Sequence, residues 1–315
     1  MRIIITGSRG LVGSNLYSYL LKNVQYNIYG IDRIYNKLYV QECFDITDFN
    51  RLNQVFIDFK PNLVIHLAAN IAVGESEINP DKYYRDNLVA TINVLSAMQQ
   101  FNCTKLIFAS TAAVYQSQDK PLTEQDALAP ESVYGRTKLL SEQIIKDYTQ
   151  KYNWQTIIFR FFNVAGGVDN HPEQLHLIPI VLDNIKNGKS IKIFGTDWDT
   201  PDGTCIRDYI HISDLIQAIE IAIHKLNDLN NYYFNIYNLG SEKGNSVNEI
   251  VIACLQIANK VALVEEVERR AGDLAICLAD ANKAHTELGW KSTKNITDII
   301  TDTWNMLNTN DNNDI

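Results

Sequence analysis

The chain has 315 residues, of which 46% are apolar and 21% are charged, and this length suits two lobes that share an interface. Acidic residues outnumber basic residues by 37 to 28, so the formal net charge is −9. A negative surface field works against general binding to nucleic acid or to anionic lipid, so we expect neither a nucleic acid nor a membrane as partner. An anionic ligand would need a local group of arginines or a helix N-terminus.

The cysteines and the opening residues bear on the cellular compartment. The five cysteines are scattered and form no C-x-x-C pair, which is typical of a reducing compartment; they are Cys43, Cys103, Cys205, Cys254 and Cys277. The opening segment MRIIITGSRG has an apolar run too short for a signal peptide or a membrane span. We therefore expect a cytoplasmic protein. The histidines show no metal-ligand spacing, and no metal site is predicted.

Apolar runs and amphipathic stretches alternate over the first half of the chain, which predicts strands and helices in turn. The expected strands are Arg2–Thr6, Asn27–Ile31, Asn62–Leu67, Lys105–Ser110 and Gln155–Arg160. The expected helices are Leu11–Leu21, Asp48–Phe59, Asp81–Gln100 and Glu131–Tyr152. This alternation predicts the α/β class, as a Rossmann-type doubly wound parallel sheet with helices on both faces. Ligands of such a sheet bind beyond the carboxyl ends of its strands.

The regular pattern ends at Asn163, where glycines and prolines begin to divide the chain into shorter pieces. We therefore predict a dinucleotide-binding domain over residues 1–163 and a smaller mixed α/β substrate-binding domain over residues 164–315. Two segments within 205–240, Arg207–His211 and Phe234–Leu239, are expected to return to the first domain as strands. The polar end, Asn308–Ile315, is expected to fray.

A glycine-rich turn, TGSRGLVG, joins the first strand to the first helix. Its glycines, Gly7, Gly10 and Gly13, would let the backbone turn sharply and approach a pyrophosphate at the helix N-terminus. Asp32 ends the second strand, where a carboxylate accepts hydrogen bonds from the hydroxyls of an adenosine ribose. Asp45 follows in the region of the adenine.

The charge of Asp32 favours NAD over NADP, because a carboxylate repels a 2′-phosphate. Arg9 and Arg33 act against this preference, since either could pair with a phosphate. We predict NAD as the cofactor.

Tyr134 and Lys138 lie four residues apart on the expected helix after the fourth strand, and therefore on one helical face. A free tyrosine has a pKa of roughly 10 and is a poor base near neutrality. A nearby ammonium and a positive nicotinamide ring would both lower that pKa. Ser110 and Thr111 end the fourth strand, and the Thr111 hydroxyl could hold a reacting sugar hydroxyl against Tyr134.

These residues resemble the extended short-chain dehydrogenase/reductase group and, within it, the UDP-glucose (UDP-galactose) 4-epimerase family. The resemblance runs from Met1 to about Trp304 and rests on the segments TGSRGLVGS, VIHLAANIAVGES, STAAVY, VYGRTK, RFFNVAG, DGTCIRDYIHISDL, YNLGSEKGNSV and RRAGDLA. It implies an NAD-dependent isomerase that inverts carbon 4 of a UDP-hexose through a transient 4-ketose. It also implies a homodimer formed by the helices near Asp81–Gln100 and Glu131–Tyr152.

The resemblance implies a role for each matching residue. Thr111, Tyr134 and Lys138 would be the catalytic set. The cofactor-binding set would be Gly7, Gly10, Leu11, Val12, Gly13, Asp32, Asp45, Ile46, Leu67, Ala68, Ala69, Asn87, Tyr134, Lys138 and Phe162, and we add Arg33 and Ser110 to it. The substrate would contact Thr111, Tyr134, Asn163, His176, Leu177, Phe194, Arg207, Arg270, Asp273 and Cys277.

The chain departs from the family pattern at a few positions. Ile71 stands where many relatives have a cofactor-contacting lysine, so one ionic contact is missing and cofactor retention is expected to be weaker. Thr111 replaces the commoner serine and keeps the hydroxyl, and His176 stands where some relatives have asparagine. Cys277 stands where relatives restricted to plain hexoses have tyrosine. This small residue predicts that N-acetylated UDP-sugars are also accepted.

Other functions share parts of this sequence pattern. A 4,6-dehydratase would need an acid and a base after the strand-four threonine, and Ala112 and Ala113 have no proton to give. An NAD(P)H-dependent sugar-nucleotide reductase stays open, because Arg9 and Ile71 do not fix the cofactor. A catalytically silent dinucleotide-binding regulator would be expected to lack Tyr134 or Lys138.

Overall fold

The computed structural model describes residues 1–167, 176–270 and 273–309. Seven strands form one sheet in the order β10-β6-β5-β4-β1-β2-β3, and every neighbouring pair is parallel. The strands are β1 (Arg2–Thr6), β2 (Asn27–Asp32), β3 (Glu42–Cys43), β4 (Leu63–His66), β5 (Lys105–Thr111), β6 (Gln155–Phe161) and β10 (Tyr233–Leu239). The predicted doubly wound parallel sheet is confirmed, with β1 next to β4 at the point where the strand order reverses.

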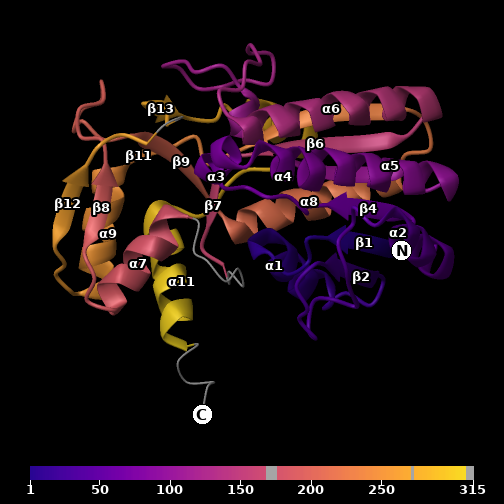
Figure 1. Cartoon of the computed structure of the whole chain (residues 1–315), viewed down its shortest axis with the longest axis horizontal. Helices are drawn as coiled ribbons and strands as arrows, with labels where there is room; N and C mark the ends of the chain where they lie inside the picture. The colour runs from indigo at the N-terminus through magenta and orange to yellow at the C-terminus, as the bar shows by residue number, and fades with distance from the viewer. Residues whose placement is uncertain (168–175, 271–272, 310–315) are drawn as a thin grey trace.

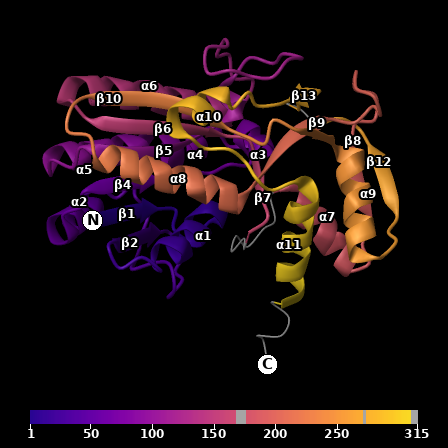
Figure 2. The ribbon, with the colours of Figure 1, turned by 180° about the vertical axis from the view of Figure 1, so that it is seen from behind.

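Helices cover both faces of this sheet, as Figures 1 and 2 show. Helices α1 (Leu11–Leu20) and α8 (Ile212–Asn227) pack on one face, and α2 (Phe49–Phe59), α5 (Ala90–Gln100) and α6 (Val133–Tyr152) pack on the other. Consecutive side chains of a strand point to opposite faces, so Ile3 and Ile5 join the first layer and Ile4 joins the second. Strands buried on both faces need such continuous apolar runs.

The expected helix Asp81–Gln100 is divided into three parts. It runs through α4 (Pro80–Tyr83) and a π-helical turn, η1 (Tyr84–Val89), into α5. A short helix, α3 (Val73–Ile78), precedes it and was not predicted. A single π-turn inside a helix is often found at a functional site.

The second lobe is built on two smaller sheets, seen beside the large sheet in Figure 1. One has four strands, of which β9 (Ile206–His211) pairs with β7 (Asn163–Ala165), with β13 (Ile276–Cys277) and, antiparallel, with β11 (Gly244–Ser246). The other pairs β8 (Ile191–Phe194) with β12 (Val264–Val267). Helices α7 (Leu177–Lys186), α9 (Val247–Ala258) and α11 (Ile296–Thr309) pack together in this lobe, whereas α10 (Asn282–Leu288) packs with β10 and α8 against the large sheet.

The two segments expected to return to the first domain differ in their positions. β10 lies in the large sheet, where it pairs with β6. β9, which contains the expected strand Arg207–His211, lies in the four-stranded sheet instead. The boundary near Asn163 stays a prediction, and most of Asn308–Ile315 falls outside the described residues. Among the described helices, none has the length and apolarity that a membrane crossing requires.

Helix α6 begins two residues later than predicted, at a well-formed cap. The hydroxyl oxygen of Ser132 accepts a hydrogen bond from the Gly135 backbone N–H at 3.0 Å, which satisfies one of the free donors of the first turn. At the other end Asn153 adopts a left-handed conformation with φ of 58°. These two ends place Tyr134 and Lys138 in the first two turns.

The glycine turn after β1 is packed too closely for side chains. A Cβ atom at Gly13 would lie 2.1 Å from the Gly7 carbonyl oxygen, and one at Gly7 would lie 2.7 Å from the Ala68 backbone nitrogen. Gly7 also has a φ of +71°, which side chains disfavour. Gly74 in α3, by contrast, has nothing within 4 Å of its Cβ position.

We expect Gly13→Ala to lower the free energy of unfolding by about 2 kcal/mol or more, because the methyl group would displace backbone. Gly74→Ala is the matched control and should leave stability unchanged or raise it by about 0.5–1 kcal/mol. Urea unfolding followed by circular dichroism measures both. Equal midpoints for Gly13→Ala and the parent would contradict this reading of the turn.

Candidate active site

Tyr134 and Lys138 lie on the buried side of α6, with 8% and 3% of their surfaces exposed. Contacts from α3 and η1 fix the start of this helix. The Tyr134 backbone N–H donates to the Ser76 hydroxyl at 3.2 Å, and the Asn87 side-chain amide donates to the Thr137 hydroxyl at 3.1 Å. The pair therefore sits between the carboxyl end of the sheet and the unpredicted helix α3.

Burial sets the protonation of both groups. It raises the pKa of Tyr134 to about 12, although a hydrogen bond with Thr111 acts in the opposite direction. Burial also lowers the pKa of Lys138 to about 7, against the attraction of Glu142. The Lys138 ammonium lies 4.5 Å from the centre of the Phe108 ring.

We expected Lys138 to lower the pKa of Tyr134. This expectation is wrong for the protein without ligands, where the pKa is raised. Removing the phenol from water costs more than its neighbours return. The hydroxyl that acts on Tyr134 is that of Thr111, in agreement with the predicted closeness of these two residues.

A buried polar network lies behind the pair and was not predicted. Arg160 on β6 donates from Nη2 to Glu142 on α6 at 2.6 Å and from Nη1 to the Tyr115 hydroxyl at 2.9 Å. Tyr115 in turn donates to the Asn238 side-chain oxygen at 2.7 Å. Ser110, a candidate cofactor residue, donates its hydroxyl to Glu142. The only sequence signals for this network were a charge inside the apolar strand FRFF and an acid four residues after Lys138.

The predicted adenosine residues lie at the ends of β2 and β3. The Asp32 carboxylate accepts from the Arg9 backbone N–H at 3.0 Å and from the Ile34 backbone N–H at 3.1 Å, so it faces the glycine turn. Asp45 accepts from the backbone and hydroxyl of Thr47 at 2.9 Å and 2.8 Å. Ile46 is buried beside it.

The loop after β4 carries the next group of candidates. Leu67, Ala68 and Ala69 leave the sheet beside the glycine turn, and the Ala68 N–H donates to the Thr6 hydroxyl at 3.3 Å. Asn87 holds the loop through two hydrogen bonds with the Asn70 backbone, of 2.8 Å and 3.0 Å.

The edge formed by β1, β2 and β4 therefore has the features of a dinucleotide site. The helix N-terminus after Gly10 has no side-chain cap, a Cβ atom at Gly10 would meet no other atom closer than 3.5 Å, and an ionisable carboxylate, that of Asp32, stands at the end of β2. These features fit an adenine dinucleotide such as NAD, with Leu11 and Val12 in the first turn of α1.

Three of the candidate substrate residues meet in the second lobe. Leu177, Phe194 and Arg270 line one cavity of about 280 Å³, and the Arg270 guanidinium lies 3.6 Å from the centre of the Phe194 ring. His176 immediately precedes α7, whose first residue is Leu177. An aromatic ring beside a cation suits a planar base joined to a phosphate.

The remaining candidates lie along β7, β9 and β13. Arg207 on β9 approaches the Asp273 carboxylate at 3.6 Å, and in the sheet it stands opposite Cys277. Asn163 begins β7. Cys277 packs against a buried apolar cluster that also contains Phe162, so it lies where the second lobe meets the carboxyl end of the large sheet.

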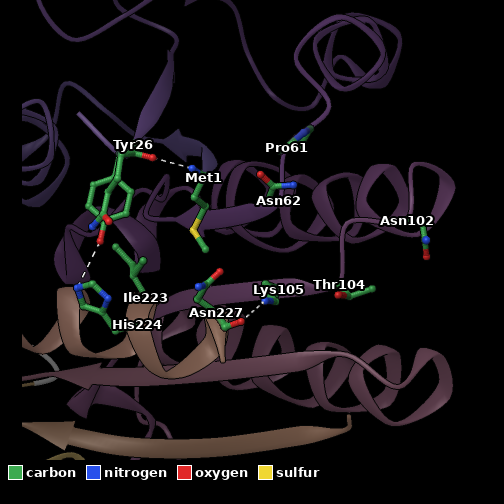
Figure 3. A pocket seen from close by; sticks show the side chains of 11 residues that line it. Met1, Tyr26, Pro61, Asn62, Asn102, Thr104, Lys105, Ile223, His224 and Asn227 are labelled. Atoms are coloured by element: carbon green, nitrogen blue, oxygen red, sulfur yellow. Dashed lines mark hydrogen bonds between the residues drawn. The ribbon is translucent and has the colours of Figure 1, made fainter. Parts of the chain in front are cut away.

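A larger cavity, of about 520 Å³, lies at the opposite edge of the large sheet, as Figure 3 shows. Met1, Asn62 and Lys105 line it at the amino ends of β1, β4 and β5, together with His224 and Asn227 of α8. No candidate residue reaches it. Ligands of doubly wound sheets bind at the carboxyl edge, so we assign this cavity no part in the chemistry. Within the described ranges, no cluster of three or more His, Cys, Asp and Glu side chains could hold a metal ion.

The sheet topology and this edge define a Rossmann-type dinucleotide-binding protein with a tyrosine–lysine pair. The model of the NAD dependent epimerase/dehydratase family matches residues 3–240. A UDP-glucose 4-epimerase of Bacillus subtilis is 35% identical, over 98% of each chain.

Two solved structures extend the likeness to the fold. UDP-glucose 4-epimerase from Bifidobacterium longum, in complex with NAD+ and UDP, is 32% identical with a TM-score of 0.91 over 99% of each chain. The UDP-Glc/GlcNAc 4-epimerase of Campylobacter jejuni is 31% identical with a TM-score of 0.83, over 98% of this chain and 99% of that one.

The chain belongs to the UDP-glucose 4-epimerases of the NAD dependent epimerase/dehydratase family. This membership confirms the predicted family and the predicted α/β Rossmann class with a smaller mixed sheet. It also confirms that the chain is an isomerase and that its cofactor is NAD. The roles assigned to single residues, and the division into domains, stay predictions.

The low pKa of Lys138 makes stability depend on pH. Between about pH 7 and 10.5 the unfolded chain holds the lysine proton while the native chain releases it, so stability rises with pH in this window. We expect the parent to gain up to about 1.4 kcal/mol per pH unit relative to Lys138→Met.

Urea unfolding at intervals from pH 7 to 10 measures this difference, with Lys146→Met, an exposed change on the same helix, as the control. Parallel pH curves for the parent and Lys138→Met would show that Lys138 stays charged in the native protein.

Proposed function

We propose that this protein interconverts UDP-glucose and UDP-galactose by inverting carbon 4, with NAD as a resident cofactor and Tyr134 as the proton acceptor. The observation that carries the assignment is the buried pair of Tyr134 and Lys138 on α6, with the Thr111 hydroxyl in contact with the phenol. This pair lies in a chain that is similar to UDP-glucose 4-epimerases over almost its whole length.

The cofactor residues follow from the carboxyl edge of the sheet. Gly7, Gly10 and Gly13, with the first turn of α1, would hold the pyrophosphate, and Asp32 would hold the adenosine ribose. Asp45 and Ile46 would meet the adenine. The loop after β4, Asn87, Ser110 and Phe162 would line the path toward Tyr134. NAD held there would supply the acceptor, and then the donor, of the hydride at carbon 4 of the sugar.

The chain itself moves the proton. Tyr134 takes the proton of the sugar 4-hydroxyl while Thr111 holds that hydroxyl in place, and the same phenol gives the proton back after the 4-ketose has turned. Because burial raises the pKa of Tyr134, a phenolate there depends on nearby positive charge. Lys138, one helical turn away, would supply part of that charge.

The substrate residues form a second set. Arg207 and Arg270 would bind the diphosphate, since guanidinium groups make charge-assisted hydrogen bonds to phosphate. Asp273 would accept from the uridine ribose, while Leu177 and Phe194 would pack against the uracil in the 280 Å³ cavity. Asn163 and His176 would complete the contacts. Such residues explain how a protein with a net charge of −9 binds an anion.

Assembly and compartment complete the proposal. We infer that two copies of the chain form a homodimer through the helical face that includes α5 and α6. Apolar side chains on this face and just before α5 are partly exposed: Val89 at 43%, Leu140 at 37% and Tyr152 at 42%. We assign a cytoplasmic location because all five cysteines are free thiols. We also place the boundary between the dinucleotide-binding and substrate-binding domains near Asn163.

We expect Tyr134→Phe to lower the rate of UDP-galactose epimerisation about 10²–10⁴-fold, because the proton acceptor is lost. Tyr152→Phe, at the exposed end of the same helix, should keep the parental rate. A coupled assay for UDP-glucose measures the rate, and the NAD extracted from each purified variant shows whether the site is intact. An active Tyr134→Phe variant with normal NAD content would remove Tyr134 from the mechanism.

We propose in addition that N-acetylated UDP-sugars are substrates. Cys277 is small, and it packs against the apolar cluster that contains Phe162, at the meeting point of the two lobes. A tyrosine at this position would fill space that an acetamido group needs. The Campylobacter jejuni structure described as a UDP-Glc/GlcNAc 4-epimerase is 31% identical to this chain.

Cys277→Tyr should abolish turnover of UDP-GalNAc and leave that of UDP-galactose within about threefold of the parent, since a steric block discriminates only against the larger sugar. Cys277→Ser keeps the small volume and should retain both activities. NMR detection of the two 4-epimers measures each substrate separately. Equal loss or equal survival of both activities in Cys277→Tyr would contradict a size gate.

A further inference from the structure

Arg33 follows Asp32 directly, but its side chain is bound elsewhere. Its guanidinium approaches the Asp86 carboxylate at 3.1 Å and donates to the Asn70 side-chain oxygen at 2.6 Å. Asn70 lies in the loop after β4, and Asp86 lies in the π-helical turn η1. The side chain thus runs from the end of β2 to the far side of β1, because β1 lies between β2 and β4 in the sheet.

The Asp86 carboxylate is buried and hydrogen-bonded in a position that pairs it with the Arg33 guanidinium. Its side chain is only 7% exposed, and it also accepts from the Arg85 Nε at 2.7 Å and from the Asn70 side-chain amide at 2.8 Å. Burial by itself would raise the pKa of Asp86, but the hydrogen bonds from Arg85 and Asn70 outweigh it and lower the pKa. Asp86 therefore stays ionised at neutral pH and keeps Arg33 paired.

This pairing bears on the choice between NAD and NADP. In Rossmann-type sites an acid at the end of the second strand binds the 2′-hydroxyl of NAD, whereas an arginine nearby accommodates the 2′-phosphate of NADP. This chain has both residue types side by side, as Asp32 and Arg33. Asp32 is directed at the glycine turn by the Arg9 and Ile34 backbone N–H groups, while Arg33 is held by Asp86.

We propose that Asp86 is a specificity-determining residue that makes the enzyme select NAD, by withholding Arg33 from a 2′-phosphate. A 2′-phosphate would meet the repulsion of Asp32 and would also have to compete with Asp86 for the Arg33 guanidinium. The 2′-hydroxyl of NAD meets neither obstacle. The proposal rests on NAD binding and not on the epimerase reaction, so a binding experiment tests it independently of turnover.

The test uses the full chain loaded with NADH, whose fluorescence reports its displacement. The measured quantity is the ratio of the NADP+ and NAD+ concentrations that displace half of the NADH. We expect Asp86→Asn to lower this ratio about tenfold, the equivalent of one charge-assisted hydrogen bond gained by the phosphate. Asp81→Asn removes the same charge from an exposed acid in α4 and should leave the ratio unchanged.

Two further variants identify the group responsible. Arg33→Ala combined with Asp86→Asn should return the ratio to the parental value, because no guanidinium is then released. Arg33→Ala alone should also leave it within about twofold of the parent, and this variant decides the matter if Asp86→Asn fails to fold. An unchanged ratio in folded Asp86→Asn, or a tenfold higher ratio in Arg33→Ala, would overturn the proposal.

Discussion

The buried ion pair between Glu142 and Arg160 holds the reacting edge of this protein together. Glu142 belongs to the helix that carries Tyr134 and Lys138, and Arg160 belongs to β6, the neighbour of β5 in the sheet. The two side chains are 4% and 2% exposed, so each charge depends on the other for solvation. Because Glu142 also accepts from Ser110 at the end of β5, one carboxylate ties the helix to two strands.

The same use of paired charge recurs at the sites assigned to the cofactor and the substrate. Arg33 is held by Asp86, and Arg207 lies near Asp273. The two pairs act in different ways: Asp86 holds Arg33 away from a 2′-phosphate, whereas Asp273 orients Arg207 before the substrate arrives, which lowers the entropy that binding must cost. Local carboxylates thus decide which arginines are free to bind an anion. The net charge alone could not have revealed this arrangement.

The sequence predicts the elements whose signal is local. The isoleucines of β1, the glycine turn and the four-residue spacing of Tyr134 and Lys138 each lie within a few residues, and the structure has them as expected. The unpredicted features depend on contacts far apart in the chain. Arg33 and Asp86 are separated by 53 residues, and Arg160 and Glu142 belong to different elements. Helix α3 has six residues and a glycine, too short for a periodic signal.

The protonation of Tyr134 was the part of the chemistry that the sequence could not give. Spacing places an ammonium near the phenol, but the pKa depends on how much water remains, and here α3 and η1 exclude it. In the protein chain alone the Tyr134 phenol, with a pKa raised to about 12, is neutral, while Lys138, with a pKa lowered to about 7, is only partly protonated near neutral pH. Proton removal therefore depends on positive charge near the phenol, from Lys138 and from the bound cofactor. The acidity of Tyr134 is thereby coupled to the charges bound in the cleft.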